Sequence, residues 1–312
     1  MSVASAPFYD DVADAPAGAA CLWLMASDGV RLRAGFWNTG TKGTVLLFPG
    51  RTEYIEKYGP AAREFAQRGY SMITIDWRGQ GLADRLLPDR MAGHVHSFAD
   101  YQKDVKALVA LAHVKGLPKP FYLVAHSMGG AIGLRALSNG LRVKATAFSA
   151  PMWGIKIQSA LRPVAWTLST LTRSIGHGHV YVPSTRQKTY VEVASFDENM
   201  LTRDATMYAF MQRQARAHPD LTLGGPTHQW LNEALNECRA LGHLPSPSLP
   251  CLTALGTLER IVDTAPVHKR MARWPGAILD IVPGAEHEVM MEKPAVRARF
   301  YDKVAALFDA NR

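Results

Sequence analysis

Short apolar runs recur along the chain, each bounded by glycine, proline or polar residues. Each run has the length and composition of a buried strand. They cover residues 44–48, 71–75, 121–125, 144–149, 251–255 and 277–282. Two further runs, 22–25 and 30–37, flank a Ser-Asp-Gly turn and predict an antiparallel hairpin at the sheet edge.

Segments with helical periodicity lie between most of these runs. They cover residues 53–68, 98–114, 129–138, 265–273 and 294–309, and Pro294 suits the first turn of the last one. Strands that alternate with helices over this length predict a mostly parallel sheet with helices on both faces. The predicted fold class is therefore α/β.

The alternation stops between residue 151 and about residue 223. A gap of this length is too long for a structureless loop in a compact domain, so we expect an insertion. One helical pattern covers residues 202–217. Apolar residues repeat at helical spacing in another segment, at Leu161, Val164, Leu168, Leu171 and Ile175. We predict a core made of residues 1–151 and 224–312 and a helical cap made of residues 152–223.

The apolar stripe of the predicted cap has two interpretations. Lys156, Arg162 and Arg173 lie near it in the sequence, and an apolar stripe with basic neighbours is typical of a helix at a lipid interface. A stripe at this spacing more often packs on a neighbouring domain. The sequence leaves both interpretations open.

Composition restricts the class of protein. The chain has 312 residues, 47% of them hydrophobic and 20% charged, which suits one large domain or a core with a subdomain. No stretch approaches the roughly 18 apolar residues of a membrane span, and the N-terminus does not look like a secretion signal. The three cysteines are too few and too scattered for a disulfide framework or a four-ligand zinc site. We expect a cytoplasmic protein with buried thiols.

The net charge of +8 could attract nucleic acid or an anionic membrane surface. The basic residues are spread along the chain, without the aromatic and basic interleaving of single-strand binders. We therefore expect no nucleic acid partner, and contact with a membrane surface stays an open alternative.

The segment Ala-His-Ser-Met-Gly-Gly, residues 125–130, directly follows a predicted buried strand. In a parallel α/β sheet, ligands bind beyond the carboxyl ends of the strands, which is where Ser127 lies. A tight strand-to-helix turn that exposes a serine hydroxyl needs small residues two positions to either side, here Ala125 and Gly129. An ordinary glycine-containing turn would give a similar short motif, but the flanking strand and helix favour a nucleophile elbow.

A serine nucleophile needs an acid and a base, in the chain order serine, acid, histidine. Of the eleven histidines, His287 combines this order with a position just past the last predicted strand. The segment after residues 251–255 offers Glu259 and Asp263 to orient the imidazole. Glu259 lies nearer the strand end and is preferred, and Asp263 remains the alternative acid.

An oxyanion hole needs two backbone amides, one of them from the residue after the serine, Met128. The loop that follows residues 44–48 would supply the other at Arg51, because Gly50 lets the backbone approach closely. A simple Pro-Gly turn before a helix explains this loop equally well. Only its pairing with Ser127 favours the functional interpretation.

Six segments run in the same order as in a known family. They are residues 49–58, 76–85, 93–105, 125–130, 256–263 and 284–288. Together they resemble the lysophospholipase and monoacylglycerol lipase group of the α/β-hydrolase superfamily, and the bacterial lysophospholipase L2-like members most of all. The resemblance implies the α/β-hydrolase fold, Ser127 as nucleophile, His287 as base, and Arg51 with Met128 as oxyanion donors. It puts the acid at Glu259, where the family usually has aspartate.

Three departures from the family pattern concern this site: Pro49 replaces the histidine that usually precedes the glycine, Ala125 replaces a glycine, and Glu259 replaces an aspartate. The resemblance implies a serine hydrolase that cleaves single-chain lipid esters, lysophospholipid or monoacylglycerol, with no cofactor and no metal. The alternatives are a short-chain esterase, thioesterase or peptidase of the same superfamily, or a hydrolase-fold binding protein without turnover.

Two further motifs have a simpler explanation. The segment 79–84 has two glycines of a dinucleotide loop but lacks the third. His94 with His96, and His177 with His179, show the spacing of metal ligands without a third ligand pattern. We expect these histidines to be solvated or hydrogen-bonded.

Overall fold

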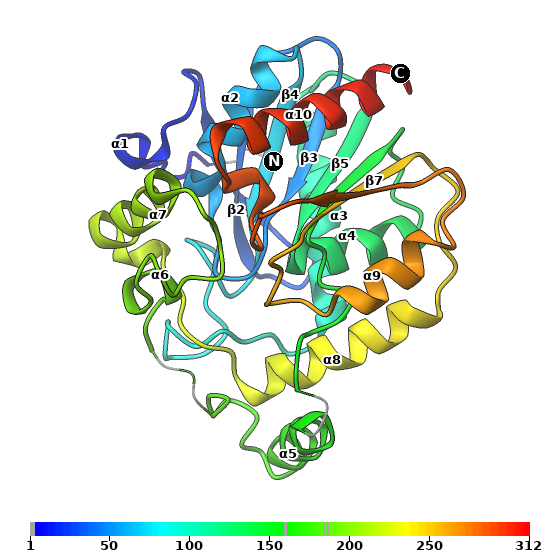
Figure 1. Ribbon diagram of the computed structural model, residues 1–312. Coiled ribbons are helices and arrows are strands. Elements are labelled where there is room, and N and C mark those ends of the chain that lie inside the picture. Colours follow the sequence, from blue (N-terminus) through cyan, green and yellow to red (C-terminus); the bar gives the residue numbers. More distant parts are fainter. Residues whose placement is uncertain (1–3, 159–160, 184, 186) are drawn as a thin grey trace.

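One sheet of eight strands runs through the molecule in the order β1-β2-β4-β3-β5-β6-β7-β8 (Figure 1). The computed structural model describes residues 4–158, 161–183, 185 and 187–312, so a few positions of the predicted core and cap ranges lie outside the described residues. The strands are β1 (Ala20–Met25), β2 (Arg31–Trp37), β3 (Thr44–Phe48), β4 (Ser71–Asp76), β5 (Phe121–His126), β6 (Thr146–Ser149), β7 (Cys251–Gly256) and β8 (Ile278–Val282).

Strand pairing confirms the predicted α/β class. Strands β1 and β2 form the expected antiparallel hairpin, and β2 is also antiparallel to β4. From β4 to β8 every neighbouring pair is parallel. The strand positions agree with the sequence prediction apart from a residue or two at some ends.

Helices cover both faces of the sheet (Figure 1). One face carries α2 (Gly59–Gln67) and α10 (Pro294–Asp309), and the other carries α3 (Tyr101–Val114), α4 (Met128–Ser138), α8 (His228–His243) and α9 (Thr264–Met271). Successive residues of β3 alternate between the two hydrophobic cores, Leu46 and Phe48 in one, Val45 and Leu47 in the other. Because both faces are covered, all five residues of this strand are buried and apolar except Thr44.

Two helices differ from the sequence prediction. The segment 53–68 is a 3-10 helix at Ile55–Tyr58 followed by α2, which starts at a Gly-Pro pair that suits a new helix start. Helix α8 was not predicted, although Trp230, Ala234 and Cys238 recur every fourth residue on its buried side. The hydroxyl of Thr227 caps its N-terminus by accepting a hydrogen bond from the Trp230 amide.

The predicted cap range contains α5 (Arg162–Ser174), α6 (Tyr190–Val193) and α7 (Ala205–Ala217). Helix α5 lies against α8 at the end of the molecule far from α10 (Figure 1). Its apolar stripe does not pack on the core, since Leu161, Val164, Leu168, Leu171 and Ile175 are all exposed. Packing on a neighbouring domain, the commoner interpretation of such a stripe, is therefore wrong for this helix. No helix in the described part of the chain is both long and apolar enough to cross a bilayer.

Candidate active site

Ser127 occupies a strained turn between β5 and α4. Its φ of 50° and ψ of −118° lie outside the regions that a non-glycine residue normally adopts. A Cβ atom on Gly129 would lie 2.2 Å from the Phe48 carbonyl oxygen and 2.5 Å from that of Pro49. The small residue predicted at this position is therefore required by the close packing of α4 on the loop after β3.

His287 connects Ser127 to a carboxylate. Its Nε2 atom lies 2.9 Å from Ser127 Oγ, and its Nδ1 atom lies 2.7 Å from Glu259 Oε2. The three side chains are buried and come from segments that follow β5, β7 and β8. These strands are parallel, so their carboxyl ends bring the three residues to one edge of the sheet.

Glu259 is held by its own turn. Its Oε1 atom accepts hydrogen bonds from the amides of Ile261, at 2.6 Å, and Val262, at 3.0 Å. Burial opposes ionisation of this carboxyl, but the hydrogen bond and charge of His287 together with the two amides lower its pKa. Asp263, the alternative acid, instead caps α9 and accepts a hydrogen bond from the Ala265 amide.

The loop after β3 is fixed by hydrogen bonds to its backbone. Trp77 Nε1 donates to the Pro49 carbonyl at 3.0 Å, and Gln80 Nε2 donates to the Gly50 carbonyl at 2.9 Å. Gln80 Nε2 also donates to the Glu53 carbonyl at 3.1 Å. The Gly50 amide donates to the Glu53 carboxylate. We call residues 49–53 the oxyanion loop.

Two backbone N–H groups near Ser127 have no hydrogen-bond acceptor among the described residues. They are the N–H of Arg51 and that of Met128. Met128 opens helix α4, and the first N–H groups of a helix have no partner within it. A negatively charged oxygen bound near Ser127 would satisfy such donors. Both residues were predicted as oxyanion donors from the sequence.

His126 lies beside His287 and was not predicted as part of the site. Its ring centroid is 4.8 Å from that of His287, and its Nδ1 atom lies 3.0 Å from the Ser149 carbonyl oxygen. Burial lowers the pKa of His126 to about 3, so the imidazole is neutral at physiological pH. Its position next to Ser127 in the sequence gave no signal of this contact.

A buried ion cluster lies behind His126. The carboxylates of Glu53 and Glu288, together with His126, have ligand atoms within 4.8 Å of one another, an arrangement that could hold a metal ion. The Lys57 ammonium already binds both carboxylates, Glu53 at 2.8 Å and Glu288 at 2.7 Å. A lysine thus takes the place of the cation.

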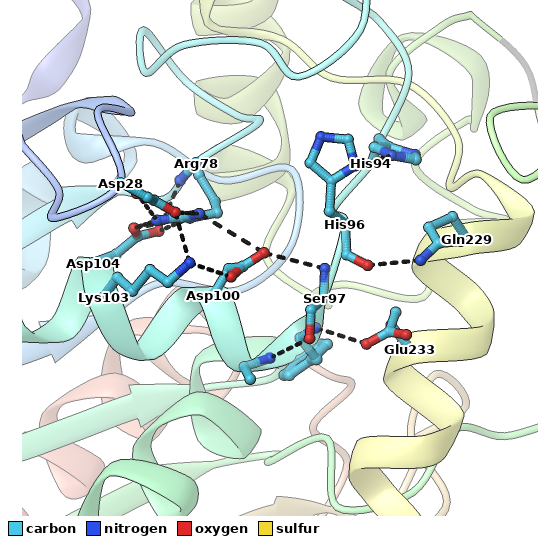
Figure 2. A network of polar contacts seen from close by, with 12 residues as sticks. Asp28, Arg78, His94, His96, Ser97, Asp100, Lys103, Asp104, Gln229 and Glu233 are labelled. Atoms are coloured by element: carbon cyan, nitrogen blue, oxygen red, sulfur yellow. Dashed lines mark hydrogen bonds and ion pairs between the residues drawn. The ribbon is translucent and has the colours of Figure 1, made fainter.

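The loop that contains His94 and His96 is tied to α8 and α3 (Figure 2). His94 Nδ1 lies 3.0 Å from the Thr227 hydroxyl, and Gln229 Nε2 donates to the His96 carbonyl at 2.7 Å. At the start of the same connection, which runs from the end of β4 to residue 97, Arg78 forms ion pairs with Asp28 and Asp104. These contacts indicate a structural role for the loop.

Comparisons with known proteins give a family and several named relatives. A family described as "Serine aminopeptidase, S33" matches residues 39–294. Probable lysophospholipase L2 of Haemophilus influenzae is 31% identical over 255 residues, which cover 81% of this chain and 79% of the relative. Lysophospholipase L2 of Escherichia coli K12 is 31% identical over 269 residues, 81% of this chain and 76% of the relative. Monoacylglycerol lipase of Mycolicibacterium smegmatis is 22% identical over 275 residues, 85% and 88% of the two chains.

Solved structures share the fold. A soluble variant of monoglyceride lipase from Saccharomyces cerevisiae, in complex with a substrate analog, superposes with a TM-score of 0.71 at 19% identity and covers 92% of this chain and 94% of its own. A lipase in an open form gives a TM-score of 0.72 at 15% identity, with 95% and 100% covered. At these identities the likeness concerns the fold alone.

Proposed function

The chain belongs to the serine aminopeptidase S33 family of α/β-hydrolases, and from this we propose that it is a carboxylester hydrolase that cleaves single-chain lipid esters through an acyl-enzyme on Ser127. The observation that carries the proposal is the unbroken line of hydrogen bonds from Ser127 through His287 to Glu259. A serine hydroxyl becomes a good nucleophile when a base of this kind takes its proton.

The proposed reaction has two half-reactions, and His287 acts first as base and then as acid in each. Ser127 Oγ attacks the ester carbonyl while His287 Nε2 takes the hydroxyl proton, and Glu259 stabilises the imidazolium. The amides of Arg51 and Met128 donate to the oxygen that becomes negative. His287 then protonates the leaving alcohol, and the acyl group stays on Ser127 Oγ. Water attacks this acyl-enzyme while His287 takes a proton from it. His287 gives that proton to Ser127 Oγ as the acyl–oxygen bond breaks, which releases the fatty acid and restores the free serine.

Lipid esters are proposed as substrates because of the relatives and the cap. The relatives include lysophospholipases and a monoacylglycerol lipase by name. We propose that residues 152–223 form the cap that shapes the acyl site. Two backbone hydrogen bonds join this range to the loop that carries His287. The His287 amide donates to the Met200 carbonyl at 3.3 Å, and the Glu288 amide donates to the Leu201 carbonyl at 2.8 Å.

The Arg51 side chain favours an anionic head group. Its Nη2 atom donates to the Gly224 carbonyl at 2.6 Å, and its guanidinium lies 5.1 Å from the Trp230 ring. Burial lowers the pKa of this guanidinium to about 10, and no carboxylate among the described residues forms an ion pair with it. A phosphate one glycerol unit away from the ester would supply the missing negative charge, which favours lysophospholipid over monoacylglycerol.

We also propose peripheral contact with an anionic membrane surface through α5. The helix turns polar residues toward α8: Asn232 Nδ2 donates to Ser169 Oγ at 3.2 Å and to Thr170 Oγ1 at 3.0 Å. Its apolar stripe is left in solvent. The sequence from residue 151 to residue 191 contains no Asp or Glu but several Lys and Arg. An apolar stripe in a basic segment suits anionic lipid.

An acyl-chain series tests the substrate class. Rates of hydrolysis are compared for lysophospholipids and for soluble p-nitrophenyl esters from short to long chains. Preference for long chains supports a lipid hydrolase. Preference for acetyl or butyryl esters would instead indicate a short-chain esterase of the same superfamily. Absence of both ester turnover and labelling of Ser127 by a fluorophosphonate would indicate a binding protein.

A further inference from the structure

The ion cluster behind the site joins two loops that are distant in sequence. Lys57 Nζ donates to Glu53 Oε1 at 2.8 Å and to Glu288 Oε1 at 2.7 Å. All three side chains are buried. Glu53 belongs to the oxyanion loop, and Glu288 directly follows His287 in the chain. One ammonium group therefore contacts both the loop that would hold the oxyanion and the loop that carries the base.

Within the oxyanion loop, the Glu53 carboxylate connects the Lys57 ammonium to the backbone. One oxygen accepts from Lys57, and the other accepts from the Gly50 amide and from the Tyr58 hydroxyl, the latter at 2.5 Å. The Gly50 amide is adjacent to Arg51, whose N–H points to no acceptor in the described part of the chain. The direction of that N–H thus depends on the bond between Gly50 and Glu53.

The charges of the cluster make this link strong. Burial opposes the ammonium charge, but Glu288 and Glu53 outweigh it and raise the pKa of Lys57. Burial likewise opposes ionisation of Glu53, yet Lys57 and its other neighbours lower the Glu53 pKa to about 2. Removing the ammonium would leave two buried carboxyl groups side by side with no cation between them, and breaking a buried ion pair is far more disruptive than changing a surface one.

We propose that Lys57 is a positioning residue. It fixes the position of the oxyanion loop relative to the loop that carries His287. The inference rests on the proposed function, since it assigns Arg51 and His287 the roles given above. Lys57 itself does not touch the reacting atoms. It acts through Glu53 on one side and through Glu288 on the other.

The test is Lys57→Met, which keeps the unbranched side chain as far as the ε position and removes the ammonium group with its charge. Turnover of a soluble p-nitrophenyl ester is measured per active site, with sites counted by fluorophosphonate titration. A small misplacement of reacting groups costs up to about a hundredfold in rate. We expect kcat to fall by about ten- to a hundredfold with KM little changed, and the affinity for a boronic acid that mimics the tetrahedral intermediate to fall in parallel.

Glu288→Gln keeps the pair between Lys57 and Glu53 and serves if Lys57→Met does not fold. We expect it to lower kcat less, again with boronate affinity falling in parallel. The matched control is Asp280→Asn, which removes a buried carboxylate shared by Arg299, at 2.5 Å, and Lys303, at 2.8 Å, away from both loops. It should lower stability and leave kcat per site unchanged.

The outcomes separate the inference from the proposed function. If wild-type protein hydrolyses the ester and both cluster variants keep wild-type kcat and boronate affinity per site, the inference is overturned and the proposed function stands. If the wild type neither reacts with the fluorophosphonate nor hydrolyses any ester, the proposed function fails first.

Discussion

Glu259 reaches His287 with its Oε2 atom 2.7 Å from Nδ1, although the family usually has the shorter aspartate at this position. The turn after β7 accommodates the extra methylene, because the amides of Ile261 and Val262 hold the other carboxylate oxygen. The departure from the family pattern therefore leaves the imidazole with a fixed, charged partner.

Glu259→Gln should abolish most of the turnover. An amide at this place cannot stabilise the imidazolium and can hold the wrong tautomer, so we expect kcat to fall by about a thousandfold or more. Glu259→Asp keeps the charge, so its kcat should fall less than that of Glu259→Gln. Asp263→Asn, at the alternative acid, should change kcat little. For each variant, kcat is measured per active site on a soluble ester. If kcat falls more in Asp263→Asn than in Glu259→Gln, the acid is Asp263.

Gly129→Ala should prevent the site from forming. The added methyl group would meet two backbone carbonyl oxygens of the loop after β3, and backbone cannot move aside as a side-chain end can. Gly133→Ala in the same helix meets Leu123 Cδ2 at 3.1 Å and Ala125 Cβ at 3.3 Å, and it should be far milder. Thermal unfolding and fluorophosphonate labelling of the two variants check this. Equal behaviour would argue against the tight packing of α4 on the loop.

The fold was predictable because its sheet is buried on both faces. Runs such as Val45–Phe48 are apolar without alternation, which indicates strands covered by helices on either side. Helix α8 was not predicted, although Trp230, Ala234 and Cys238 recur at helical spacing and Thr227 is a suitable N-cap residue. This helix follows the long insertion and not a strand, so the alternation of strands and helices does not predict it.

The site was only partly predictable. Ser127 and His287 stand in segments whose order and position suggest their roles. Lys57 and Glu288 gave no such signal, because their contact joins positions that are 231 residues apart. His126 likewise contacts His287 only through the meeting of two strand ends. Periodicity and short motifs do not describe contacts of this range.

The α5 stripe predicts binding to anionic vesicles. Val164 and Leu171 are each more than half exposed, at 56% and 55%. The double variant Val164→Ser, Leu171→Ser should bind phosphatidylglycerol vesicles about tenfold or more weaker than wild type, since each residue loses apolar burial in the lipid. Hydrolysis of a soluble ester should not change. Cosedimentation with vesicles measures the binding.

A matched pair elsewhere controls for general loss of apolar surface. Met25 and Val114 are exposed at the edge of the sheet and at the end of α3, so Met25→Ser, Val114→Ser should bind vesicles as wild type does. Equal binding of the α5 double variant and wild type would contradict the proposal. A dimer that dissociates only in the α5 variant would show that a second copy covers the stripe.

Arg51→Gln should discriminate between head groups. The substitution keeps the backbone N–H but removes the guanidinium, which pairs with no carboxylate in the described part of the chain. We expect the ratio of kcat/KM for lysophosphatidylglycerol to that for monoacylglycerol to fall about tenfold, because a charged hydrogen bond is lost for one substrate only. If kcat/KM falls equally for both substrates, Arg51 only supports the loop, and other residues recognise the head group.

The most direct test of the central claim is release of fatty acid from lysophosphatidylcholine by wild-type protein and by Ser127→Ala, prepared and assayed side by side. The account predicts release by the wild type and a rate lower by about a thousandfold or more in the variant, because the acyl-enzyme cannot form without the Ser127 hydroxyl. Equal rates for the two proteins would contradict it and place the reaction outside Ser127.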